Sequence, residues 1–407
     1  MTQEVPGPES TFLSSWLRYH RRPTCPVGLA CQLTGSMGEG LDWDAIFARA
    51  HAQGIAPILY ATLVRWKIDV NAPRFVRFGA AHGATLRQNL LYLDELARIA
   101  SRFVREGIET IVLKGAALLL TTYPHPALRP MGDLDLLVRE ADVTRALDAA
   151  RALGYALLRP GVTTEVLATN HEIELVRTLS DGTRLYLEIH WRLVPRESLI
   201  RGADVESRSL WRDALDTGDP AVPARVLAPE DALVFAALHL WRHAFSRAIW
   251  LVDVAMLAEA QGLLWEDVAT KAREWDAGPP LYVTLGGSRS LCDARIPDGI
   301  LASIDPGRVR EMAVDAILNW QNTFGAHAAL GERALSPARR YLLKLLLARD
   351  TFTALAGAVR ILFPSSAWLR ARYDLGANTP TAFARWRHLL AAAREAFRGT
   401  GRDPVDA

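Results

Sequence analysis

The apolar residues of this chain change their spacing twice, and this change constrains the fold more than any other feature. Over residues 42–67 and 84–107 they recur every three or four positions, which is the pattern of amphipathic helices. The spacing then shortens, and the chain shows four short strand-like segments, at residues 108–113, 133–138, 172–179 and 184–190. From Pro229 onward the helical spacing returns. We therefore predict an α+β protein in which a small mixed sheet is embedded in a mostly helical chain.

Local signals divide the chain further. The Asp181-Gly182 pair predicts a hairpin between the last two strand segments, because Asp-Gly favours the tight turns that join antiparallel strands. A helix is predicted over 141–153, ending at Gly154. Further helices are predicted at residues 233–257, 265–275, 309–320, 338–363 and 381–397. We divide the chain into an N-terminal helical region, a core, a C-terminal helical domain and a flexible tail, at residues 1–84, 85–200, 201–398 and 399–407.

Composition limits the classes of protein to which the chain can belong. Of its 407 residues 50% are hydrophobic and 23% are charged, and the net charge is +2, which excludes a wholly disordered chain and a general polyanion-binding protein. No uninterrupted apolar run reaches the ~18 residues of a membrane-spanning helix. The odd number of cysteines, Cys25, Cys31 and Cys292, favours reduced thiols over a disulfide framework, and the spacing of Cys25 and Cys31 does not suit a zinc site. We therefore expect a cytoplasmic protein with no membrane partner.

Asp133-Leu134-Asp135 is the most informative motif of the chain. Residues i and i+2 of a strand point to the same face, so the two carboxylates should project together. Carboxylates placed so closely repel one another unless a cation lies between them, and oxygen ligands suit hard divalent ions such as Mg²⁺. The motif therefore predicts a metal site on the strand 133–138.

Two other segments strengthen this interpretation. Lys114-Gly115 follows a strand and precedes a helix, a position where backbone N–H groups and the helix dipole bind anions. Glu188 is a carboxylate on an otherwise apolar strand, where burial is costly unless the group is paired or binds a metal. Strand spacing alone leaves Glu174 as an alternative third acid. Three convergent acids beside a phosphate-binding turn are what two-metal phosphoryl transfer requires.

Three stretches of the chain resemble a known family. They read VLKGAALLLTTYPHPALRPMGDLDLLVRE with LEIHW, then LAPEDALVFAALHLWRH with WLVDVAML, and finally ILFPSSAWLRARYDL. This order resembles the uncharacterised nucleotidyltransferase family called nucleotidyltransferase type 5, within the DNA-polymerase-β-like superfamily. The resemblance covers roughly residues 85–390. It implies a polymerase-β-like core that uses a nucleoside triphosphate and Mg²⁺, with Mn²⁺ as an alternative ion.

The resemblance also implies roles for individual residues. Asp133, Asp135 and Glu188 would bind the metal and form the catalytic set, which favours Glu188 over Glu174, and Glu188 would also be a candidate base toward the acceptor hydroxyl. Lys114 and Gly115 would hold phosphate. The wider superfamily carries Gly-Ser where this chain has Lys-Gly, so a lysine point charge would replace a serine hydroxyl there. Because only four of the 47 basic residues are lysines, Lys114 is of special interest.

The remaining candidates each have two interpretations. Arg129 would contact a phosphate or pair with a motif aspartate, and His190 would contact substrate or be packed in the core. His239 and His243 lie four residues apart, and a continuous helix would extend their stripe to Ser246, Trp250 and Asp253. That stripe would face either the site or the core. The arginines of the C-terminal region are expected to be solvated rather than to bind an acidic acceptor: Arg370, Arg372, Arg385 and Arg387.

The leading functional hypothesis is an Mg²⁺-dependent nucleotidyltransferase that moves a nucleoside monophosphate to a hydroxyl or phosphate and releases pyrophosphate. The acceptor would be a natural product, peptide, sugar or RNA, with a small molecule or peptide favoured. The sequence identifies no partner protein. The alternatives are a non-catalytic nucleotide-binding or interaction module and a toxin-like tRNA nucleotidyltransferase.

Overall fold

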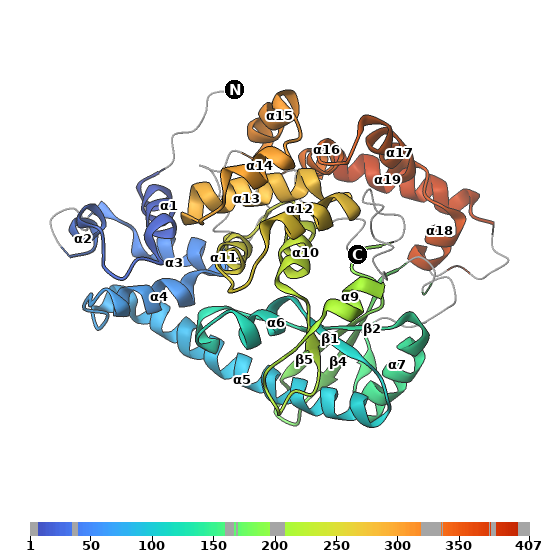
Figure 1. The fold of residues 1–407 in the computed structure, drawn as a ribbon, viewed down its shortest axis with the longest axis horizontal. Coiled ribbons are helices and arrows are strands. Elements are labelled where there is room, and N and C mark those ends of the chain that lie inside the picture. Colours follow the sequence, from blue (N-terminus) through green and yellow to red (C-terminus); the bar gives the residue numbers. More distant parts are fainter. Residues whose placement is uncertain are drawn as a thin grey trace.

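The computed structural model shows a helical protein built around one mixed sheet (Figure 1). It describes residues 7–34, 40–158, 170–195, 208–318, 337–373 and 380–397, together with 167, 335 and 375. The predicted tail at 399–407 lies outside these residues. The N-terminal helices are α1 (Pro8–Tyr19), α2 (Val27–Thr34), α3 (Trp43–Ala52), α4 (Ala56–Arg65) and the long α5 (Val76–Arg105).

The sheet has seven strands in the order β3-β4-β5-β2-β1-β7-β6. Their bounds are β1 (Thr110–Leu113), β2 (Leu134–Val138), β3 (Ala156–Leu157), β4 (Glu172–Thr178), β5 (Arg184–His190), β6 (Leu215–Asp216) and β7 (Arg225–Val226). At its centre β2 runs antiparallel to β1 and parallel to β5, while β4 and β5 form the hairpin predicted around Asp181-Gly182. The prediction of a small mixed sheet within a mostly helical chain is confirmed.

The two faces of the sheet differ in chemistry because side chains alternate along each strand. One face is apolar and packs on α5 and on α7 (Val143–Ala152), with Val112, Leu136 and Leu187 in its core. The opposite face carries Asp135 and Glu188 and turns toward the helical C-terminal half. The polar face is therefore the one available for a site.

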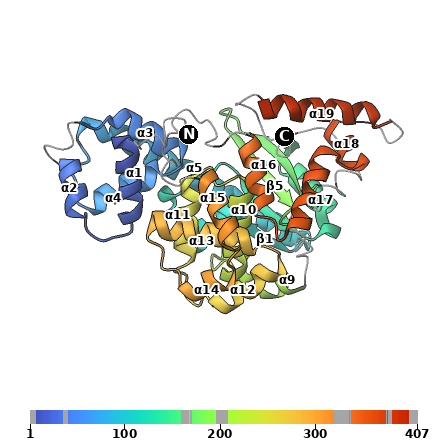
Figure 2. The same cartoon turned by 90° about the horizontal axis from the view of Figure 1, so that it is seen from above.

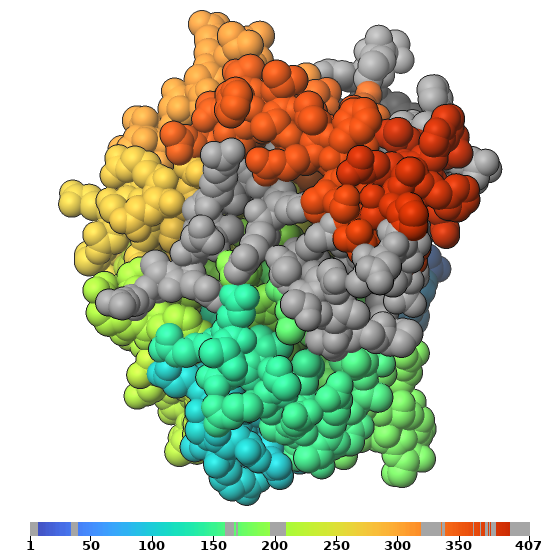
Figure 3. Space-filling view, turned by 90° about the vertical axis from the view of Figure 1, so that its right-hand side faces the viewer, coloured from blue at the N-terminus to red at the C-terminus, as the bar shows by residue number. Residues whose placement is uncertain are grey.

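The C-terminal half covers the polar face with helices (Figures 1 and 2). They are α9 (Arg208–Asp213), α10 (Pro229–Arg242), α11 (Ala248–Leu257), α12 (Trp265–Glu274), α13 (Gly278–Cys292), α14 (Asp298–Ser303), α15 (Arg308–Leu318), α16 (Pro337–Leu346), α17 (Thr351–Leu362), α18 (Ser366–Tyr373) and α19 (Ala382–Phe397). Figure 3 shows the last of them, in orange and red, on the upper part of one side, with the sheet half below. Helices α1–α4 lie at one end of the molecule, and α18 and α19 lie toward the other (Figure 2).

Three predicted helices are each two helices in the structure. Residues 42–67 divide at a turn that contains Gly54 with φ 74°, and residues 338–363 divide between α16 and α17. Residues 233–257 divide between α10 and α11, where Ala244 and Phe245 both have positive φ. Neither is a glycine, so the local sequence carries no signal for that break.

Three of the seven strands were not predicted from the sequence. β3, β6 and β7 have two residues each, which is too short for any periodicity to appear. β7 nevertheless pairs with β1 and extends the sheet beyond residue 200. In the described part of the chain, no helix has both the length and the apolar character needed to cross a membrane.

Candidate active site

A cavity of about 340 Å³ separates the polar face of the sheet from the helices above it. The sheet contributes acidic side chains, helix α6 (Lys114–Thr121) forms one edge, and α10 and α11 form the opposite wall. Every site residue predicted from the sequence except His190 lines this cavity: Lys114, Gly115, Arg129, Asp133, Asp135, Glu188, His239 and His243. His190 lies directly beneath, in contact with two of the acids.

Strand register places the central acids. Asp135 of β2 is opposite Glu188 of the parallel strand β5, and Glu188 is in turn opposite Glu174 of β4. Asp133 stands just before β2 and lines the same cavity. Asp135 is 1% exposed, so its charge is compensated by other side chains rather than by water.

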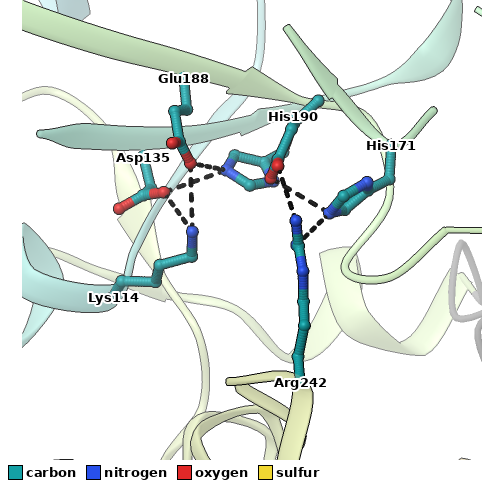
Figure 4. A network of polar contacts seen from close by, with 7 residues as sticks. Lys114, Asp135, His171, Glu188, His190 and Arg242 are labelled. Atoms are coloured by element: carbon teal, nitrogen blue, oxygen red, sulfur yellow. Dashed lines mark hydrogen bonds and ion pairs between the residues drawn. The ribbon is translucent and has the colours of Figure 1, made fainter. Parts of the chain in front are cut away.

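The cation beside these acids is Lys114 (Figure 4). Its Nζ lies 2.6 Å from Asp135 Oδ1 and 3.2 Å from Glu188 Oε2. Lys114 has a φ of 46°, a conformation that non-glycine residues adopt at an energetic cost. This strained turn between β1 and α6 directs the ammonium at the carboxylates.

His190 contacts the same two oxygens from β5. Its Nε2 lies 3.0 Å from Asp135 Oδ1 and 3.2 Å from Glu188 Oε2. Burial alone would lower the pKa of His190, but Glu172, Asp135 and Glu188 outweigh it and raise the pKa to about 9. In this structure His190 is therefore a buried charged partner of the acids, and it is not among the residues that line the cavity.

Burial and mutual repulsion set the charge of the acids. Burial, with repulsion from Asp135, raises the pKa of Asp133 to about 6. Burial likewise raises the pKa of Glu188 to about 7, against the opposing effect of Lys114. Burial would also raise the pKa of Asp135, but Lys114 and His190 hold it below its usual value. The site concentrates more negative charge than its own cations neutralise, which favours a further cation.

A second group of polar side chains extends the network along the cavity toward α10. Glu172 of β4 lies 3.3 Å from His190 Nδ1, 3.1 Å from His171 Nε2 and 2.9 Å from Arg242 Nη2 of α10. Burial lowers the pKa of His171 to about 4, so this imidazole is neutral. Figure 4 shows Arg242 reaching from the helical half to the sheet. These contacts tie α10 to β4 beside the acids.

In this structure Arg129 pairs with an aspartate of α11, Asp253, and not with an aspartate of the Asp133-Leu134-Asp135 motif. Its Nη2 donates to Asp253 Oδ2 at 3.0 Å, and the hydroxyl of Tyr123 donates to Asp253 Oδ1 at 2.7 Å. The guanidinium packs on Gly115, where an added Cβ would lie 2.3 Å from Arg129 Nη1. Gly115 is therefore required for this close approach.

The helical wall of the cavity is aromatic. His239, His243 and Trp250 contact one another, with ring centroids 4.6 to 5.2 Å apart. Burial lowers the pKa of both histidines, that of His243 to about 3, so the rings are neutral. The predicted continuous helix was wrong, yet the break after α10 still brings Trp250 against the two histidines.

The chain matches a known protein family over the residues that build this site. Residues 39–292 match the model of a family described as uncharacterised nucleotidyltransferase, which is more than half of the chain. The chain belongs to this family. The match includes the sheet, helices α10 to α13 and all the candidate residues, and helices α14 to α19 follow it. No curated protein matches the chain.

Membership confirms the family that the sequence indicated, and it assigns the chain to the nucleotidyltransferases as a class. The first two of the three stretches lie within the matched residues, and the third, at residues 361–375, follows them. Nucleotidyltransferases use nucleoside triphosphates together with divalent metals. The acids of this member fit a metal, because Asp135 and Glu188 present carboxylate oxygens within 4.8 Å of each other. The Lys114 ammonium already stands beside two of those atoms, which shows that they attract a cation.

Sequence reasoning missed several residues of this family member's site. His171, Glu172 and Arg242 join the charge network, and Arg247 lines the cavity with its guanidinium 5.8 Å from the centroid of Trp250. Within the described part of the chain Arg247 has no ion-pair partner. Glu172 lies on a strand in which acids alternate with apolar residues, as Glu188 does, and this pattern could have identified it from the sequence. Arg242 and Arg247 are two of 43 arginines, and nothing local distinguishes them.

Proposed function

We propose that this protein transfers a nucleoside monophosphate from a nucleoside triphosphate to a hydroxyl or phosphate of an acceptor, with release of pyrophosphate. The observation that carries the proposal is the pairing of Asp135 with Glu188 across β2 and β5, beside Asp133 and the Lys114-Gly115 turn. Family membership supports the reaction class. Because triphosphates are abundant in the cytoplasm, we propose that it works there.

The acids and the Lys114-Gly115 turn would have different roles at the triphosphate. Asp133, Asp135 and Glu188 would hold Mg²⁺, which when bound neutralises charge on the phosphates and polarises the group under attack. Lys114 and the first N–H groups of α6 would contact the outgoing phosphates, because a helix N-terminus carries partial positive charge. His190 holds Asp135 and Glu188 in place from below.

The helical wall would bind the rest of the nucleotide. His239, His243 and Trp250 form an aromatic surface with neutral rings on which a nucleobase can stack. Arg247 stands beside Trp250 with a charge that is available to a phosphate. Arg129 would act at a distance, by fixing α11 to the turn that carries Gly115.

The cavity favours a small molecule or a peptide as acceptor over RNA. Its volume of about 340 Å³ is at the lower end of small-ligand sites, and Glu172 and Glu174 add acid to its rim. An RNA-binding groove presents positive charge to the phosphate backbone instead.

Incubation with α-labelled nucleoside triphosphates and Mg²⁺ tests the proposal. Label transfer or pyrophosphate release is expected with the unmodified protein and is expected to be lost in the double variant Asp133→Asn, Asp135→Asn. Unchanged turnover in that variant would contradict the assigned site. Label transfer is then followed across pools of small molecules, peptides and RNA to identify the acceptor.

A non-catalytic nucleotide-binding module is the second candidate, and one observation favours it. Lys114 forms ion pairs with both Asp135 and Glu188 without a metal. This function requires that a non-hydrolysable triphosphate bind equally well with Mg²⁺ and with EDTA. Isothermal titration calorimetry distinguishes the two, since the proposed enzyme binds the nucleotide more tightly when the metal is present.

A further inference from the structure

We infer that the Lys114 ammonium takes the place of a divalent cation in the nucleotide-free protein and excludes metal from Asp135 and Glu188 until a nucleotide draws the ammonium away. The inference rests on the proposed function for the nature of the site. It goes beyond that function because it concerns the order in which metal and nucleotide bind.

The distances carry the argument. Lys114 Nζ lies 2.6 Å from Asp135 Oδ1, and Mg²⁺ binds carboxylate oxygen at about 2.1 Å. A metal on that oxygen therefore lies within about 5 Å of the ammonium, wherever around the oxygen it is bound. In a buried site, a double and a single positive charge at that separation repel strongly. Asp135 and Glu188 therefore bind the metal more weakly while the ammonium is beside them.

On the side away from Lys114, His190 occupies the space that a metal on these carboxylate oxygens would need in the nucleotide-free protein. His190 Nε2 lies 3.0 Å from Asp135 Oδ1 and 3.2 Å from Glu188 Oε2. The two oxygens are thus enclosed by an ammonium and an imidazole. Of these two groups, His190 is also held by Glu172, whereas Lys114 stands at the cavity edge with a side chain that is 16% exposed. Lys114 is therefore the group that can move.

A lysine suits this role better than an arginine. Its ammonium is a compact point charge on a flexible stem, so it can exchange carboxylates for phosphates by rotation of the side chain. Arg129, in the same cavity, is instead fixed by several hydrogen bonds to one carboxylate. Lys114 is one of four lysines in a chain that has 43 arginines.

The consequence is coupled binding. The free protein binds divalent metal weakly, and a triphosphate strengthens metal binding because its phosphates attract Lys114 away from the acids. By thermodynamic linkage, the metal strengthens nucleotide binding by the same factor. The site is then loaded with metal only when its substrate is present.

Direct measurement of Mn²⁺ binding tests the inference without relying on turnover. Mn²⁺ titrations followed by electron paramagnetic resonance, in the absence of nucleotide, are expected to give a Kd for Lys114→Met that is at least about tenfold lower than that of the unmodified protein. Lys271→Met is the matched control, because Lys271 also pairs with buried acid, 2.6 Å from Asp231, outside the cavity. Its Kd should be unchanged.

A second variant keeps the test valid if Lys114→Met does not fold. Lys114→Gly removes the same charge and suits the φ of 46°, so it should also bind Mn²⁺ more tightly and gain thermal stability on Mn²⁺ addition. Adding Asp135→Asn to either variant should abolish the gain.

Equal Mn²⁺ affinity of the unmodified protein and both Lys114 variants would overturn the inference. The same titrations with a non-hydrolysable triphosphate then separate the two proposals. If the unmodified protein binds Mn²⁺ with the nucleotide, the proposed function survives that result. If Mn²⁺ binds under neither condition, the metal-dependent function falls as well.

Discussion

Two buried charge clusters border one cavity and differ in how their cations are held. The Lys114 cluster consists of Lys114, Asp135, Glu188 and His190, and it has two carboxylates that each contact two cations. The Arg129 cluster consists of Arg129, Asp253 and Tyr123, and its single carboxylate accepts from both other members.

The difference separates a binding site from a structural contact. In the Arg129 cluster a rigid guanidinium and one carboxylate satisfy each other and join helix α11 to the segment before β2. In the Lys114 cluster the acids border on Asp133 and on further carboxylates, so negative charge exceeds what the lysine and histidine supply. Both clusters bury charge. Only the Lys114 cluster, together with the acids on which it borders, has more acids than cations, and this excess is the feature that indicates a cation-binding site.

The largest expected effect is on the Lys114 cluster. We expect Glu188→Gln to lower kcat for nucleotidyl transfer by about a thousandfold, the size that loss of a transition-state contact produces. The matched variant is Glu174→Gln on the adjacent strand, which we expect to lose less than about tenfold. Steady-state kinetics with labelled triphosphate measures both. A greater loss in Glu174→Gln would make Glu174 the third acid.

The second prediction concerns stability and the Arg129 cluster. Asp253→Asn keeps the shape of the side chain but leaves the Arg129 charge buried without its partner, and we expect the free energy of unfolding to fall by about 3 kcal/mol. Asp44→Asn is the control, because its pair with Arg77 is exposed and should contribute within about 0.5 kcal/mol. Urea denaturation followed by circular dichroism compares them. Equal effects would contradict a structural role for the Arg129 cluster.

The third prediction concerns the contact between the two clusters. Gly115→Ala places a Cβ 2.3 Å from Arg129 Nη1, so the guanidinium must shift from Asp253. We expect a loss of about 2 kcal/mol in the free energy of unfolding. Gly132→Ala on the same cavity meets no atom within 4 Å and should be nearly neutral. Similar thermal denaturation midpoints for the two variants would show that Arg129 adapts freely.

The smallest expected effect is on Lys114 itself. Lys114→Arg keeps the charge but replaces a compact ammonium with a larger planar group, and we expect kcat to fall about tenfold. Turnover at saturating triphosphate measures this. If Lys114→Arg has full activity, the rarity of lysine in this chain reflects composition alone.

The sequence predicted well whatever depends on neighbouring residues. Strand β5 and the hairpin turn at Gly182, with φ 85°, were read from alternation and from the Asp-Gly pair. The strand with Asp135 was read in the same way, and it is β2 of the structure. Breaks within helices were predicted poorly, because the turn at Ala244 and Phe245 uses positive φ without glycine.

By itself, the sequence determined the four longer strands, the acids of Asp133-Leu134-Asp135 and the strand-to-helix turn at Lys114, since each follows from propensities within a few residues. Only the tertiary structure decided that Lys114 pairs with Asp135 and that Arg129 pairs with Asp253, 124 residues away. Which buried charges pair depends on strand register and helix packing across the whole fold. Those choices minimise uncompensated buried charge, a property of the assembled protein that no local stretch of sequence contains.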